Sequence, residues 1–96
     1  MKQFVVYILT NERYGVLYTG VTSDLVGRVW QHKEEMMPGF TSKYKTKSLV
    51  YYEMHDSADA AITREKQIKR WQRMWKIELI EKMNPGWEDL YPTLTD

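Results

Sequence analysis

The sequence predicts a single α+β domain built on a three-stranded sheet. Three short segments are rich in β-branched and aromatic residues, and two longer segments repeat apolar residues at helical spacing. A chain of 96 residues has room for one hydrophobic core, so residues 1–96 are interpreted as one domain. With 43% hydrophobic residues and only 3 prolines, the composition supports packing and excludes the intrinsically disordered class.

The first two strands are predicted to form a hairpin. Residues 4–9 (FVVYIL) and 16–18 (VLY) have strand composition, and residues 11–15 (NERYG) between them are typical of a turn. A third strand is predicted at residues 48–54 (SLVYYEM), after a polar, lysine-rich loop at residues 40–47.

Two helices complete the predicted fold. Thr22, Ser23 and Asp24 are N-cap candidates for a helix over residues 25–35, which ends before Pro38. A long helix is predicted from about residue 60 to residue 83, where Ala61, Ile68, Trp75 and Leu79 recur at helical spacing. Residues 84–86 (NPG) end it, and residues 87–91 are expected to form a short last helix or a strap over the core.

Composition also bounds location and partners. The chain has no Cys, no apolar run long enough for a membrane helix and no signal peptide at its start, so we expect a cytoplasmic protein with no membrane partner. The net charge is only +1, but it is segregated. Six cations stand between residues 64 and 76 against one acid, and the tail from residue 77 is acidic.

Candidate site residues lie on the predicted strands and helices. Tyr7 and Tyr18 belong to the hairpin and Gly20 follows them, although half-buried tyrosines are usually packing residues. Arg28 and His32 are four residues apart on the first helix and share a face. An arginine there commonly extends to water, but a planar guanidinium also suits phosphate binding.

Glu65 is predicted to point toward the core from the long helix. A carboxylate in that position needs a partner. Two interpretations are about equally supported by the residues alone: an ion pair with Arg28 or a nearby lysine, or an oxygen ligand for Mg²⁺ or Mn²⁺.

Basic residues form a predicted stripe on the other side of the long helix. Four cations without an interleaved acid repel one another unless an anionic partner is present. Together with basic and aromatic residues of the loop at 40–47, they suit a nucleic-acid backbone. The candidate nucleic-acid-binding residues are Lys43, Tyr44, Lys45, Lys66, Lys69, Arg70 and Arg73, with Lys47 beside them.

The ordered set of these residues resembles the signature of the GIY-YIG nucleases. It comprises Tyr7, the run Tyr18-Thr19-Gly20, Arg28, His32, Glu65 and Asn84. Residues 5–7 read VVY in place of the GIY of the family name, and Thr19 replaces its Ile. Residues 64–71, 76–80 and 84–91 are similar to small stand-alone bacterial members related to the N-terminal nuclease domain of excinuclease ABC.

The resemblance implies a fold and a chemistry. It implies a three-stranded antiparallel sheet flanked by helices, in the order β-β-α-β-α-(α), and a metal-dependent endonuclease acting on DNA. Glu65 would hold one Mg²⁺ or Mn²⁺, and Arg28 would stabilise the transition state. Tyr7 or His32 would take a proton from water, Tyr18 would bind phosphate or nucleophile, and Gly20 and Asn84 would support the site.

Three functions follow for comparison. The first is the endonuclease, with branched, nicked or single-stranded DNA as substrate and a role in repair. The second is a nucleic-acid-binding module of the same fold without cleavage, and the third is a protein-interaction domain. Retention of Tyr7, Tyr18, Arg28 and Glu65 together favours the first, because binding alone requires neither a core-facing carboxylate nor paired tyrosines.

Overall fold

The computed structural model describes residues 3–95 and contains three strands and five helices. All strand pairs are antiparallel, with β1 in the centre and β2 and β3 at the edges. The predicted three-stranded α+β fold is therefore confirmed. The elements are β1 (Phe4–Thr10), β2 (Leu17–Thr22), α1 (Leu25–Lys33), α2 (Phe40–Tyr44), β3 (Ser48–His55), α3 (Ala58–Arg70), α4 (Arg73–Met83) and α5 (Tyr91–Leu94).

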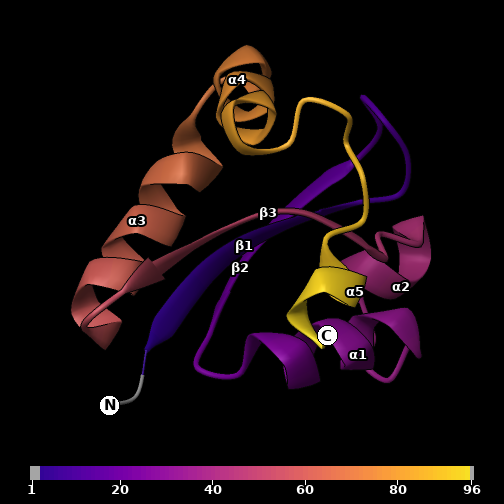
Figure 1. Cartoon of the computed structure of the whole chain (residues 1–96), viewed down its shortest axis with the longest axis horizontal. Coiled ribbons are helices and arrows are strands. Elements are labelled where there is room, and N and C mark those ends of the chain that lie inside the picture. The colour runs from indigo at the N-terminus through magenta and orange to yellow at the C-terminus, as the bar shows by residue number, and fades with distance from the viewer. Residues whose placement is uncertain (1–2, 96) are drawn as a thin grey trace.

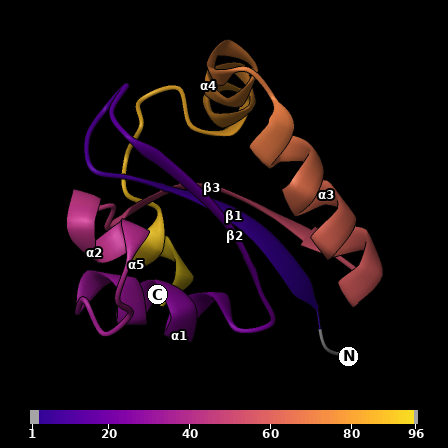
Figure 2. The ribbon, with the colours of Figure 1, turned by 180° about the vertical axis from the view of Figure 1, so that it is seen from behind.

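Helices cover both faces of the sheet. Figures 1 and 2 show α3 and α4 on one side of the strands, and α1, α2 and α5 on the other. Because side chains alternate along β1, Val6 and Ile8 join the core under α3 and α4, whereas Val5, Tyr7 and Leu9 join the core under α1. Within residues 3–95, no helix is both long and apolar enough to cross a membrane.

The segment after α4 closes both cores. Trp87 packs in the core under α3 and α4, and Leu90 packs against the core on the opposite face. The strap between them is tied to β3, since Leu90 N donates to Leu49 O at 2.7 Å and Leu49 N donates to Asp89 Oδ1 at 3.0 Å. The predicted strap and short last helix are thus both present.

The single long helix predicted for residues 60–83 is wrong, because Trp71 and Gln72 are extended, with ψ of 149° and 155°. Arg73 explains the break. Its guanidinium donates to the carbonyl oxygens of Tyr14 and Gly15, at 2.5 and 2.7 Å, which fixes the start of α4 on the β1–β2 turn. The helical spacing therefore stops at Ile68, and Trp75 is 50% exposed.

Two smaller differences concern α1 and the following loop. The first helix ends at Lys33 and not at residue 35, because Glu35 adopts a left-handed conformation with φ of 55°. The lysine-rich segment predicted as loop contains α2, a helix of five residues that ends at the left-handed Lys45.

The register of the hairpin generates a test of packing. Gly20 lies opposite Tyr7, and a Cβ on Gly20 would come within 2.5 Å of the Tyr7 Cζ and hydroxyl oxygen. We expect Gly20→Ala to lower the free energy of unfolding by about 1–3 kcal/mol through overpacking. Urea denaturation measures this.

Gly86→Ala is the matched control, since its nearest contact would be an ordinary 3.6 Å to Glu88 Cγ. A loss of stability that is equal in the two variants would contradict the close approach of Tyr7 to Gly20.

Candidate active site

The candidate site is built around the buried ring of Tyr7. Tyr7 is only 1% exposed and sits on the central strand, and its ring lies over Gly20 of the neighbouring strand. Since β2 is an edge strand, the missing side chain at Gly20 lets the Tyr7 hydroxyl reach toward the open edge of the sheet. A glycine is required here for the space that it leaves.

The Tyr7 hydroxyl is hydrogen-bonded to a buried histidine. Tyr7 OH lies 3.0 Å from His32 Nε2, and His32 Nδ1 lies 3.0 Å from Thr41 Oγ1. His32 is 1% exposed and Thr41 is 5% exposed. The three side chains connect β1, α1 and α2 in one buried chain of hydrogen bonds.

Ionisation preferences assign the direction of these bonds. Burial, followed by the neighbouring Tyr18, raises the pKa of Tyr7 well above its usual range, so Tyr7 is a phenol that donates. Burial and the charge of Arg28 lower the pKa of His32, so its imidazole is neutral. His32 Nε2 therefore accepts from Tyr7, and His32 Nδ1–H donates to Thr41.

Aromatic rings line the site beside this chain. The Tyr18 ring centroid lies 6.3 Å from that of Tyr7 and 5.5 Å from that of His32. Phe40 of α2 lies 5.7 Å from Tyr18 on the other side. The short helix thus supplies both a ring beside Tyr18 and the hydroxyl that contacts His32.

Two opposite charges act on the Tyr7 hydroxyl. The guanidinium of Arg28 lowers the pKa of Tyr7 and the carboxylate of Glu65 raises it, in both cases less than burial does. Arg28 belongs to α1 and Glu65 to α3, which cover opposite faces of the sheet. Their influence meets at Tyr7, because α3 packs across β1 and β2 and the Tyr7 ring lies over β2.

Glu65 has one occupied oxygen. Its Oε2 accepts from Lys69 Nζ at 2.9 Å, and the Glu65 side chain is 14% exposed. The ion pair considered in the sequence is therefore made with Lys69, one turn along α3. Among residues 3–95, no hydrogen bond or ion pair involves Glu65 Oε1, which leaves it available to a ligand.

The donor set suits a hard cation that is held mainly by water and substrate. Within the described chain, no three His, Asp or Glu side chains gather as a ready-made metal cage. Mg²⁺ and Mn²⁺ accept a single carboxylate when waters and phosphate oxygens complete the shell. Glu65 is the residue that fits this chemistry.

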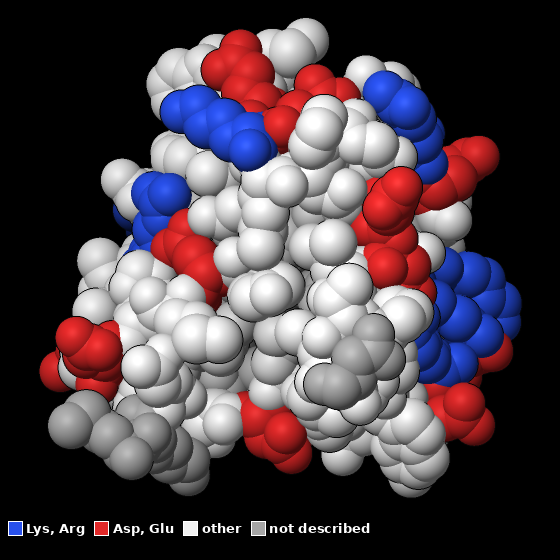
Figure 3. Space-filling view, in the orientation of Figure 1, with Lys and Arg blue, Asp and Glu red and all other residues white. Residues whose placement is uncertain are grey.

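The predicted basic stripe is not continuous. Arg73 belongs to α4 and binds the β1–β2 turn, so its prediction as a member of a stripe on one helix is wrong. Lys69 is paired with Glu65. Figure 3 shows, on the face it presents, Lys and Arg in separate groups that alternate with acids around an uncharged centre.

The loop lysines and Asn84 have local partners. Lys45 and Lys47 both pair with Glu35, and Lys43 Nζ lies 5.3 Å from the centroid of the Tyr44 ring. The Asn84 amide donates to Val50 O at 3.2 Å and Glu88 O at 2.7 Å, so it braces the strap against β3 and does not contact Tyr7 or Glu65.

Sequence reasoning missed Phe40 and Thr41. Both lie in the segment predicted as loop, where no apolar repeat indicated structure. The available signal was the spacing of Phe40 and Tyr44, four residues apart, whose rings pack at 4.7 Å across one turn of α2.

Comparison with known proteins agrees with this geometry. The family model of the GIY-YIG catalytic domain matches residues 3–78. A UPF0213 protein of Staphylococcus saprophyticus is 33% identical over 82 residues, which cover 85% of this chain and 99% of the relative. A UPF0213 protein of Staphylococcus aureus strain N315 is 35% identical with the same coverage.

A solved structure gives the same result for the fold. The solution NMR structure of a UPF0213 protein from Bacillus halodurans has a TM-score of 0.57 and 26% identity, covering 91% of this chain and 92% of that one. The central tyrosine, the helices on both faces and the match over residues 3–78 lead to one conclusion. This chain belongs to the GIY-YIG catalytic domain family.

Proposed function

We propose that this protein is a metal-dependent endonuclease that hydrolyses phosphodiester bonds in DNA. One observation carries the proposal: a buried phenol bonded to a neutral imidazole also feels a guanidinium and a carboxylate from different helices. Packing alone does not require that convergence. Family membership supports a nuclease, and the resemblance to the nuclease domain of excinuclease ABC supports a repair role on branched, nicked or single-stranded DNA in the cytoplasm.

Tyr7 acts as a proton relay in this proposal. Even an unperturbed phenol costs about 4 kcal/mol to ionise at pH 7, and the pKa of Tyr7 is raised further. The attacking water therefore passes its proton to the Tyr7 oxygen while the Tyr7 proton moves to His32 Nε2. The new P–O bond forms as the bond to the 3′-oxygen breaks, and the 3′-oxygen takes a proton from solvent.

Charge on the phosphate is handled by the flanking residues. Glu65 would hold the divalent ion, which supplies positive charge to the phosphate and the leaving oxygen when bound. Arg28 neutralises charge that develops on the pentacovalent phosphorus, and Tyr18 hydrogen-bonds a phosphate oxygen or the incoming water. Thr41 accepts from His32 and holds the imidazole in the tautomer that can receive the proton.

A non-catalytic nucleic-acid-binding module is the second candidate. The Lys69–Glu65 ion pair favours it, since it competes for the carboxylate. A protein-interaction domain is the third, and it has no requirement for divalent ions.

Cleavage of labelled single-stranded, duplex and forked DNA tests the leading proposal. We expect cutting with Mg²⁺ or Mn²⁺ and none with chelator. Glu65→Gln and Arg28→Ala should each lower the rate at least about 100-fold, because each removes charge stabilisation in the transition state. Glu34→Gln, an exposed acid of the same type, is the control and should keep the wild-type rate.

Cutting that persists in both site variants would indicate a contaminating nuclease and would remove the mechanism. Salt-sensitive binding without cutting under any condition would support the binding module instead.

The state of His32 gives a second test. Nitrogen-detected NMR should show a neutral imidazole protonated at Nδ1, with a pKa below the ordinary value of about 6.5. The unfolded chain then binds more protons just below that pH, so the stability contribution of neutral His32 is complete above about 6.5 and is lost as pH falls. A proton on Nε2 in the folded protein would contradict the proposed relay.

Thr41 provides a third test that separates positioning from packing. Thr41→Val keeps the shape but leaves the His32 Nδ1–H without its acceptor, at a cost of about 1–3 kcal/mol. We expect the cleavage rate to fall about tenfold or more, a shift in the tautomer ratio, and little change in KM. Thr41→Ser should restore both rate and tautomer. Equal behaviour of the Val and Ser variants would show that the hydroxyl plays no part.

A further inference from the structure

Helices α3 and α4 meet at a corner that carries two tryptophans outside the proposed chemistry. Trp71 follows the last residue of α3, and Trp75 lies in the first turn of α4. Their ring centroids are 6.1 Å apart, at an interplanar angle of 81°. Trp75 is 50% exposed, and the half-buried Trp71 has the Arg64 guanidinium 5.0 Å from its ring centroid. Two indoles therefore meet the solvent at one place.

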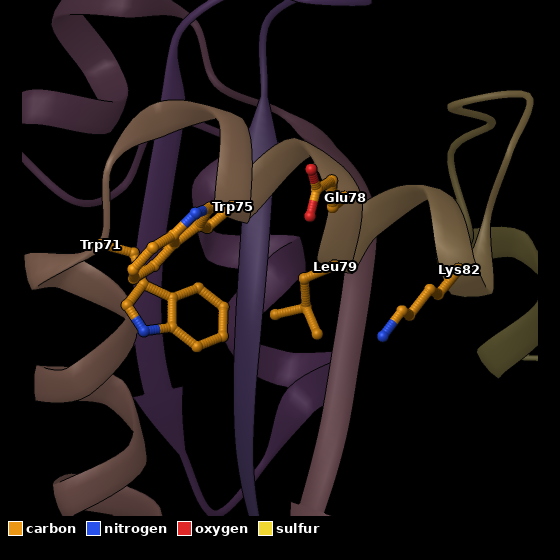
Figure 4. A pocket seen from close by; sticks show the side chains of 5 residues that line it. All are labelled: Trp71, Trp75, Glu78, Leu79 and Lys82. Carbon is orange, nitrogen blue, oxygen red and sulfur yellow. The ribbon is translucent and has the colours of Figure 1, made fainter.

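Trp71 separates two hollows in the surface. The first, of about 300 Å³, is lined by Trp71, Trp75, Glu78, Leu79 and Lys82. The second, of about 390 Å³, lies on the α3 side of Trp71 and is lined by Thr63, Lys66, Gln67 and Arg70. Figure 4 shows the two indoles, Leu79 and Lys82 extending to one side of α4, with the Glu78 carboxylate pointing away from the rings.

Cations without ion-pair partners border both hollows. Lys66 and Arg70 line one and Lys82 lines the other, and no carboxylate within residues 3–95 lies in ion-pair distance of these three. Glu78 is the single acid of either lining. Burial together with the nearby Arg73 and Lys69 lowers the pKa of Lys76, which reflects the same excess of positive charge.

We propose that Trp71 and Trp75, with Lys66, Arg70 and Lys82, bind an unpaired segment of single-stranded nucleic acid. The exposed π-faces of unpaired bases stack on indoles, and the phosphates between them meet the cations. This inference rests on the proposed function only in its choice of a nucleic-acid ligand, and it adds the strand state that the protein prefers.

The surroundings favour this ligand over a protein partner. Protein interfaces are depleted of lysine at their centres, whereas here lysine or arginine lines each hollow beside an indole. The paired bases of a duplex hide their faces from a tryptophan, so the platform selects unpaired strands. Trp71 follows Glu65 by six residues at the end of the same helix, which is about 9 Å along its axis. A strand held at the corner therefore lies close to the candidate active site.

Binding of a labelled oligothymidylate to the 96-residue chain in chelator, followed by fluorescence anisotropy, tests the inference without cleavage. Trp75→Leu should weaken single-strand binding about tenfold, because one stacking surface is lost. The matched control is Trp30→Leu, whose indole is 46% exposed on α1 and should leave affinity unchanged. Thermal unfolding checks that both variants are folded.

An abasic strand of equal length separates stacking from charge. It should bind less tightly than oligothymidylate, and Trp75→Leu should make no further difference to it. Lys82→Gln should weaken both strands alike and reduce the salt dependence. A Trp75 effect of the same size on the abasic strand would overturn the proposal.

Other outcomes are equally decisive. If Trp75→Leu binds oligothymidylate as tightly as wild type, or if it instead dissociates a dimer in sedimentation, the proposed platform is wrong. A protein that cuts DNA but shows no Trp75 dependence would disprove this inference alone. Trp75-dependent binding without any cleavage would disprove the nuclease proposal and leave the platform intact.

Discussion

The hydrogen bond between the Tyr7 hydroxyl and His32 is the constraint on which the site depends. A hydroxyl and an imidazole that are buried together cannot remain unpaired without a large loss of stability. Their contact therefore fixes α1 relative to the central strand, and Thr41 extends the same requirement to α2. One chain of polar atoms positions three elements relative to one another, and it is also the chain proposed to move the proton.

The place of the site follows from strand order. β1 is the central strand, so its side chains cannot reach solvent at an edge unless a neighbour leaves space. Gly20 leaves that space on β2, and the Tyr7 ring occupies it. Arg28 and Glu65, which arrive from helices on opposite faces, act on the ring where it approaches this edge. A site shared by two layers is thus possible in a sheet of only three strands.

Local patterns predicted the parts of the fold that local forces decide. The hairpin and third strand follow from β-branched runs and turn residues, and Tyr7, Arg28 and Glu65 could be selected by their order along the chain. The division between α3 and α4 could not, because it depends on Arg73 reaching carbonyl groups nearly sixty residues away. The position of Thr41 beside His32 likewise depends on tertiary packing, which leaves no periodic signal in the sequence.

The strap after α4 has a consequence for how the chain folds during synthesis. Trp87 completes one core and Leu90 contributes to the other, and the strap that carries them is held by contacts to β3, some forty residues earlier. A nascent chain of which only the part up to α4 has emerged still has two incomplete hydrophobic layers. The sheet and its helices therefore become cooperative only when this last segment has left the ribosome, so the domain matures after translation of its C-terminal turn and not progressively from its N-terminal hairpin.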